Sequence, residues 1–470
     1  MLFNSYGYLF VFLPVALLGY FAARRHSTLA LSWLVFVSLT FYAWWNPWHL
    51  PLIIASIAAN FLIGERIRAT RLHKRQWLIA GIAANLTLLG VFKYARFAVE
   101  SVNAATAGTL ALPSLALPLG ISFFTFTQIA YLVDTARDEV NDSNPLHYAL
   151  FVTFFPHLLA GPIIHHREMM PQFAAADGRR FDATNLARGL FLLALGLGKK
   201  VLIADPLGNT ANAGYENIGA LDLAGAWSTT LSYTFQIYFD FSGYTDMALG
   251  AAQMFNIRLP VNFNSPYRAT DIQDFWRRWH ITLSRFLGDY LYIPLGGNRA
   301  GNMRVGANLL ATFLLGGLWH GAGWTFVAWG GLHGLALLVH RIWRQAGLRL
   351  PQAIAISLTF LFVHITWIFF RAHNLADAMT LARKLVPTWS DLANMLPHAS
   401  ANVVIGLPYA APAPAVLLFV AACLVLLPVN SDKLTERFAG RSWEAGLAAF
   451  LIAAGVLTLS QVTQFLYFNF

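Results

Sequence analysis

Apolar stretches long enough to span a lipid bilayer recur from one end of this chain to the other. A helix needs about 20 mostly apolar residues to cross the hydrocarbon core. Because only helices and closed barrels satisfy the backbone in lipid, these stretches predict an all-α polytopic membrane protein. They lie near residues 6–23, 29–45, 48–64, 77–97, 115–133, 186–204, 224–250, 324–343, 354–370, 412–428 and 445–466.

Two further apolar runs, at 148–164 and 305–318, are too short to cross a bilayer comfortably. We expect them to form half-helices or re-entrant segments packed among the spans, where broken backbone can line protein or a cavity. The sequence shows neither an internal repeat nor a low-complexity linker. It therefore predicts a single membrane-embedded domain over residues 1–470.

Composition and charge exclude the common soluble classes. Charged residues make up only 11% of the chain and hydrophobic residues 57%, against about 25% charged residues in soluble domains. The net charge of +10 would suggest nucleic acid for a soluble protein. In a membrane protein, however, Lys and Arg gather in short cytoplasmic loops, so we expect no nucleic-acid partner.

Basic loops also predict the orientation of the spans. Arg24 and Arg25 follow the first span, and the basic run ERIRATRLHKR at 65–75 follows the third. Both loops are expected on the cytoplasmic side, which places the N-terminus outside.

The segment 256–304 is the longest polar stretch between predicted spans, and it too is basic. Thr270 and Gln273 form a capping-box pattern that predicts the start of an amphipathic helix. Its apolar stripe would consist of Ile272, Trp276, His280, Leu283 and Leu287. The segment has three acids, against seven arginines at positions 258, 268, 277, 278, 285, 299 and 304. We therefore expect it to be cytoplasmic, with His280 serving either for packing or in a site.

His320 follows the short apolar run 305–318, with glycines on both sides of it. This pattern predicts a broken helix with a titratable group at the break. Within a membrane domain that is a functional-site signal, although a histidine bonded to a neighbouring carbonyl would look the same. His333, on the next span, is expected to face the same cavity.

Several familiar chemistries have no support in the sequence. There is no GxSxG nucleophile motif, and GLGKKVL lacks the upstream glycine and the Ser/Thr of a P-loop. His165 and His166 are adjacent, so we do not expect them to converge on one ion, and HEXXH is absent. We predict no metal site.

Long motifs in this chain resemble the membrane-bound O-acyltransferase family, in particular its bacterial branch for alginate and cellulose O-acetylation. They are YFDFSGYTDMALGAAQMFNIRLPVNFNSPYRATDIQDFWRRWHITLSRFLGDYLYIPLGGNR, GGLWHGAGWTFVAWGGLHG, PLGISFFTFTQIAYLVD, FPHLLAGPI, GLGKKVLIAD, FFRAHNLADA and the closing FLYFNF. The resemblance implies a ring of roughly 11–13 transmembrane helices with re-entrant half-helices around a central catalytic tunnel. It also implies the bacterial inner membrane as the location, with a periplasmic N-terminus.

The resemblance further implies an O-acyltransferase that moves an acetyl group from a cytosolic donor, acetyl-CoA, toward an exopolysaccharide. The histidine of the LWHG motif, His320, is the implied catalytic base, and His280 of the WRRWH motif is the second catalytic histidine. Residues expected to contact the donor are Arg277, Arg278, Arg285, Trp276, Trp319 and His333. Ion pairing with Asp274 is an equally good reading of Arg277 and Arg278.

We expect no tightly bound cofactor, and as partners membrane lipid and the periplasmic acetyltransferase or carrier proteins of an exopolysaccharide complex. The acceptor stays open among alginate, cellulose, another exopolysaccharide and a partner protein. A transporter or flippase for a polysaccharide or lipid intermediate is the alternative function, since transporters also use broken helices.

Overall fold

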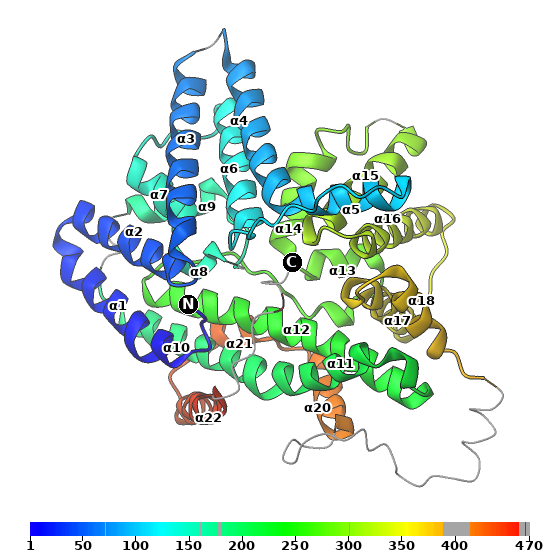
Figure 1. The fold of residues 1–470 in the computed structure, drawn as a ribbon. Coiled ribbons are helices and arrows are strands. Elements are labelled where there is room, and N and C mark those ends of the chain that lie inside the picture. Colours follow the sequence, from blue (N-terminus) through cyan, green and yellow to red (C-terminus); the bar gives the residue numbers. More distant parts are fainter. Residues whose placement is uncertain are drawn as a thin grey trace. The chain divides into compact units, whose positions relative to one another are not determined.

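The computed structural model describes residues 1–70, 72–159, 161–175, 180–299, 301–388, 414–459 and 466. Within these residues the chain forms helices and no strands, which confirms the all-α prediction (Figure 1). They fall into two compact units that alternate along the sequence, so we describe each unit separately. The long helix α12 (Leu223–Met254) contributes its first part to the second unit and its last part to the first.

The first unit comprises residues 1–197, 244–262 and 431–470. It contains the broken pair α7 and α8 that the sequence predicts near 148–164, interrupted at Phe154. Its helices are η1 (Tyr8–Phe12), α1 (Leu13–Ala22), η2 (Ala23–Arg25), α2 (Ser27–Ala43), η3 (Pro47–His49), α3 (Leu50–Ala69), α4 (Lys74–Leu89), η4 (Gly90–Tyr94), α5 (Ala95–Thr106), α6 (Ile121–Ala136), α7 (Pro145–Thr153), α8 (Phe155–Leu158), α9 (His166–Ala174), α10 (Ala183–Gly198), α21 (Ser431–Glu436) and α22 (Ser442–Thr458).

The second unit comprises residues 198–243 and 263–430, and it carries both histidines of the predicted site. Besides the first part of α12, its helices are η6 (Lys199–Ala204), α11 (Asp205–Glu216), η7 (Ile218–Ala220), η8 (Pro266–Arg268), α13 (Ile272–Arg278), α14 (Ile281–Leu287), η9 (Gly288–Tyr292), α15 (Gly301–His320), α16 (Trp324–Gln345), α17 (Gln352–Arg371), α18 (Leu375–Lys384) and α20 (Pro414–Leu426).

Among the residues that the structure describes, four helices are long and apolar enough to cross a membrane: Tyr8–Arg25, Pro47–Ala69, Lys74–Thr106 and Gln352–Arg371. Several of them leave large apolar side chains exposed, among them Phe10, Leu18, Leu62 and Ile79. Helices that face water normally carry polar residues on their outer face. Exposed apolar side chains are instead typical of helices that face lipid. The higher number of spans that the resemblance implies remains a prediction.

The segment 256–304 differs from the single amphipathic helix expected from the sequence. The helix stops at Arg278 and a new one begins at Ile281, so α13 and α14 each have 7 residues. The predicted cap is also one residue off. The side chain of Asp271, not Thr270, accepts the backbone N–H of Asp274 at 2.8 Å, and Asp274 in turn accepts the N–H of Thr270 at 3.2 Å.

The run 305–318 was expected to form a short half-helix or a re-entrant segment, and the helix there is longer than its apolar length predicts. A re-entrant placement remains a prediction. Helix α15 extends from Gly301 to His320 and has 20 residues. Hydropathy missed its polar first turn, GNMR, because these residues are helical without being apolar. The closing motif FLYFNF lies outside the described residues except for Leu466.

Candidate active site in the second unit

His280 lies at the break between α13 and α14, in a backbone conformation that side chains rarely adopt. Its φ of 44° and ψ of 53° are left-handed, and its side chain is fully buried. This conformation costs a non-glycine residue roughly 1–2 kcal/mol. The backbone nevertheless stays bonded on both sides, since Trp279 N–H donates to Phe275 and Ser284 N–H donates to His280. The surrounding packing therefore holds a strained residue at this position.

His320 is the last residue of α15 and is also buried. Helices α15 and α16 pack closely because glycines face each other along their contact. A Cβ at Gly317 would lie 2.3 Å from the Phe326 carbonyl oxygen, and one at Gly330 would lie 2.2 Å from the Phe313 carbonyl oxygen. Small residues of this kind let membrane helices approach until their backbones touch. The contact fixes the end of α15, and with it His320.

The structure brings the two predicted catalytic histidines together. Their ring centroids are 6.3 Å apart, although 40 residues separate them in sequence. Aromatic side chains surround the pair: Phe241 lies 4.8 Å from His280, and Trp319, Trp329 and Phe370 lie 5.0, 5.1 and 5.3 Å from His320. An apolar enclosure of this kind lowers the local dielectric constant and strengthens electrostatic interactions inside it.

His333 and Trp276, both predicted donor-binding residues, are bonded to each other. The indole N–H of Trp276 donates to Nδ1 of His333 at 3.2 Å, so the imidazole proton is on Nε2. Nε2 then donates to the Thr366 hydroxyl at 3.1 Å, and that hydroxyl donates to the Val363 carbonyl at 2.8 Å. This arrangement occupies both ring nitrogens of His333 with protein partners.

The Trp276–His333 pair contacts the site through Trp329. Trp329 packs between His333 and His320, with its ring centroid 4.8 Å from that of His333 and 5.1 Å from that of His320. Trp276 also contacts Trp329, at 5.8 Å. The geometry therefore places His333 and Trp276 where they position Trp329. Trp319, the other predicted tryptophan, touches His320 directly and lies 6.3 Å from His280.

A further buried histidine, His364 on α17, was not singled out from the sequence. The hydroxyls of Thr234 and Thr230 lie 2.8 and 3.3 Å from its two nitrogens, and its ring stacks on Trp227 at 5.3 Å. An ionisable residue in the apolar stretch 354–370 was the available signal, because such residues are rare in membrane spans.

The predicted donor-binding arginines separate into two groups. Arg277 and Arg278 line a polar hollow of about 450 Å³ together with Arg268, Thr270, Asp271, Asp274, Gln352 and Ile356. Nε of Arg278 also pairs with Asp274 at 2.8 Å, which is the alternative the sequence left open, while Arg277 is exposed. Arg285 lies on α14 and is not among the residues that line this hollow.

Comparison with known proteins identifies the chain. The family model described as MBOAT, membrane-bound O-acyltransferase family, matches residues 26–375, a range that includes His280 and His320. This chain belongs to the membrane-bound O-acyltransferase family. As a member it is an acyltransferase with a polytopic, all-α membrane fold, and the alternative of a transporter or flippase is set aside.

Similar members of the family have several names. The peptidoglycan O-acetyltransferase of Helicobacter pylori is 43% identical, with 100% of this chain and 98% of that protein covered. A Pseudomonas aeruginosa protein named "Probable alginate O-acetylase AlgI" is 42% identical over 80% of this chain and 73% of its own. The teichoic acid D-alanyltransferase of Bacillus subtilis is 28% identical over 52% of this chain and 66% of its own.

Proposed function

We propose that this O-acyltransferase passes an acetyl group from cytosolic acetyl-CoA to a glycan of the cell envelope, with His320 as the general base. The buried approach of His280 to His320, at 6.3 Å between ring centroids, is the observation that carries the proposal. Two similar proteins are named for acetyl transfer, one to peptidoglycan and one to alginate.

His320 takes up the proton of the acceptor in this mechanism. The acceptor hydroxyl oxygen attacks the thioester carbonyl carbon while an unprotonated ring nitrogen of His320 removes its proton, the role that histidine most often has in general base catalysis. A C–O bond forms and the C–S bond breaks, and the proton then passes to the departing thiolate. The products are the O-acetyl ester and free coenzyme A.

His280 orients the donor and polarises its carbonyl in the same scheme. A hydrogen-bond donor aimed at the developing oxyanion lowers the barrier most when it is already held in place. The strained backbone and complete burial of His280 are what such preorganisation requires. The aromatic side chains around both rings exclude water, which would otherwise hydrolyse the thioester.

The polar hollow beside α13 is the proposed contact for the phosphates of acetyl-CoA. Arg268, Arg277 and Arg278 supply its positive charge. Arginine binds phosphate through paired, charge-assisted hydrogen bonds. Asp271 and Asp274 also line the hollow, so part of that charge is already compensated.

A bacterial inner-membrane location, with a periplasmic N-terminus and a cytoplasmic 256–304 segment, completes the proposal. The charged donor cannot cross lipid, whereas an acetyl group transferred at buried histidines can leave on the other side. Peptidoglycan is the first acceptor to test because the Helicobacter pylori relative, which matches over nearly its full length, is named a peptidoglycan O-acetyltransferase. Alginate is the second, then cellulose and a periplasmic acetyltransferase or carrier protein of an exopolysaccharide complex.

The test uses the purified chain in sealed proteoliposomes. Acetyl-CoA labelled in its acetyl group is supplied on one side and muropeptides, alginate or cellulose oligosaccharides on the other. The proposal expects ester-linked label on one acceptor and free coenzyme A on the donor side. Coenzyme A released with label found only as acetate, with every glycan acceptor and with candidate periplasmic partner proteins, would contradict it.

A further inference from the structure

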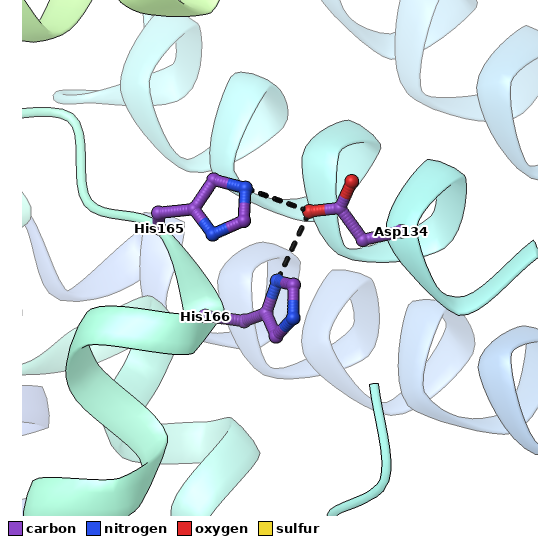
Figure 2. A group of neighbouring side chains, drawn as sticks. All are labelled: Asp134, His165 and His166. Carbon is purple, nitrogen blue, oxygen red and sulfur yellow. Dashed lines mark hydrogen bonds and ion pairs between the residues drawn. The ribbon is translucent and has the colours of Figure 1, made fainter. Parts of the chain in front are cut away.

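A second cluster of titratable side chains lies in the first unit, apart from the proposed chemistry. His165 and His166 both point toward one carboxylate oxygen of Asp134 (Figure 2). The oxygen Oδ2 lies 3.1 Å from Nε2 of His165 and 3.0 Å from Nδ1 of His166. Asp134 is 1% exposed, His166 5% and His165 17%.

The local backbone explains why two adjacent histidines can converge, contrary to the expectation from the sequence. His165 is the extended N-cap residue of α9, with φ −107° and ψ 141°, and His166 is the first residue of the helix. The change of conformation between them turns both rings to the same side. Asp134 approaches from the last turn of α6.

We propose that Asp134, His165 and His166 bind a zinc ion. Two imidazole nitrogens and a carboxylate oxygen are a donor set that Zn²⁺ takes up readily, at about 2.0–2.2 Å from each atom. At these bond lengths, neighbouring ligand atoms of a tetrahedral site lie about 3.4 Å apart. The carboxylate oxygen is 3.0 and 3.1 Å from the two imidazole nitrogens, and all three atoms lie within 4.8 Å of one another, so modest side-chain adjustments bring them to these separations.

The contacts around His166 orient its imidazole ring in the way that is usual for a metal ligand. Its Nε2 lies 3.1 Å from the backbone carbonyl of Glu139. In the zinc-bound form the ring proton would be on Nε2 and donate to this carbonyl, and Nδ1 would bind the ion in place of its contact with Asp134. Metal-binding histidines generally have such a second partner. Arg137 lies 3.8 Å from the other oxygen of Asp134, Oδ1.

His165 completes the set and is its most exposed member. Its partial exposure gives the fourth position access to solvent. The backbone N–H of Arg167 donates to its Nδ1 at 3.4 Å. Binding through Nε2 places the proton on Nδ1, so this long contact is lost when zinc enters.

The site would fasten the end of α6 to the start of α9 on the cytoplasmic side. Asp138, just beyond α6, pairs with Lys74 at 2.7 Å, and Arg68 donates to the backbone carbonyl of Asp142 at 3.2 Å. Both partners belong to the basic run 65–75, which includes the end of α3 and the start of α4 and which the sequence predicts to be cytoplasmic. The role we assign to the ion is structural, and it does not depend on the proposed acetyl transfer.

Metal content and thermal stability of the full chain in detergent test this inference. After removal of metal with a chelator, the wild type is expected to take up about one Zn²⁺ per chain and to melt at a higher temperature. Co²⁺ in its place should give the visible absorption of a tetrahedral site. His165→Ala, at the most exposed ligand, should lose both the bound zinc and the thermal shift.

His147→Gln is the matched control. Nδ1 of His147 lies 2.5 Å from Asp142 in the same unit, but this pair belongs to no three-residue group among the described residues. This variant should keep the zinc. Equal zinc in wild type and His165→Ala, or no uptake and no thermal shift in the wild type, would show a hydrogen-bonded cluster only and would overturn the proposal.

Discussion

The imidazole rings of His280 and His320 lie 6.3 Å apart in a buried aromatic enclosure, one at a strained helix break and the other at a helix end. Two different structural features position these rings. A left-handed backbone sets His280, whereas contact between glycine backbones sets His320. Each feature can be tested separately from the chemistry.

The strained backbone at His280 allows its conformation to be separated from its imidazole. We expect His280→Ala and His280→Gly both to lower acetyl transfer severalfold, because both remove the ring. Glycine adopts the left-handed conformation without strain. Full acetyl transfer by His280→Gly, but not by His280→Ala, would mean that activity needs the left-handed backbone at this position and not the imidazole ring. Donor KM and kcat, measured for both variants, decide between these outcomes.

The glycine contact between α15 and α16 predicts a sharp difference between two neighbouring positions. Gly330→Ala would place its Cβ 2.2 Å from a backbone oxygen, so the helices must separate. Overpacking of this kind costs about 1–3 kcal/mol. Gly331→Ala is the control, since its Cβ would meet Leu314 at an ordinary 3.5 Å. Melting in detergent and acetyl transfer should both fall for Gly330→Ala only; equal behaviour of the pair would contradict this packing.

The arginine hollow predicts salt-dependent donor binding. Charge reversal in Arg277→Glu or Arg278→Glu should raise the KM for acetyl-CoA, and more so at low salt, where screening is weaker. Arg299→Glu reverses a charge in the same segment outside the hollow and should leave KM unchanged. A similar rise in all three variants would indicate a general charge effect and not a phosphate site. Arg285, also expected to bind the donor, can be compared in the same series.

The location of the 256–304 segment can be measured with thiol labelling. Cys423 is the one native cysteine and is exposed, so a Cys423→Ser background is required. A cysteine introduced at Asn298 or Asn302, both exposed, should react with a membrane-impermeant reagent only after the cells are opened. Labelling in intact cells would contradict the cytoplasmic assignment and the donor-side role of the hollow.

Sequence reasoning located the helices and His320 because both leave local signals. A long apolar stretch indicates a helix that can span a membrane. The glycines on both sides of residue 320 indicate the end of α15. The break at His280 left no such signal, since residues 279–281 include neither glycine nor proline. Packing alone imposes it.

Contacts between distant segments were equally hidden from the sequence. The approach of His280 to His320 spans 40 residues, and the meeting of Asp134 with His165 spans 31. The Trp276–His333 bond also depends on how α13 meets α16. Local patterns singled out His280 and His320 separately, but only the resemblance to a family assigned both to one site, and nothing in the sequence pointed to the Asp134 cluster.

The role of His320 is tested most directly by acetyl transfer from labelled acetyl-CoA by purified His320→Ala. His364→Gln, a change at another buried histidine of the same unit, controls for damage to the fold. We predict that His320→Ala inserts and purifies like the wild type but transfers acetyl groups about 10²–10⁴-fold more slowly, the usual contribution of a general base. Near-normal transfer by this well-folded variant would contradict the account.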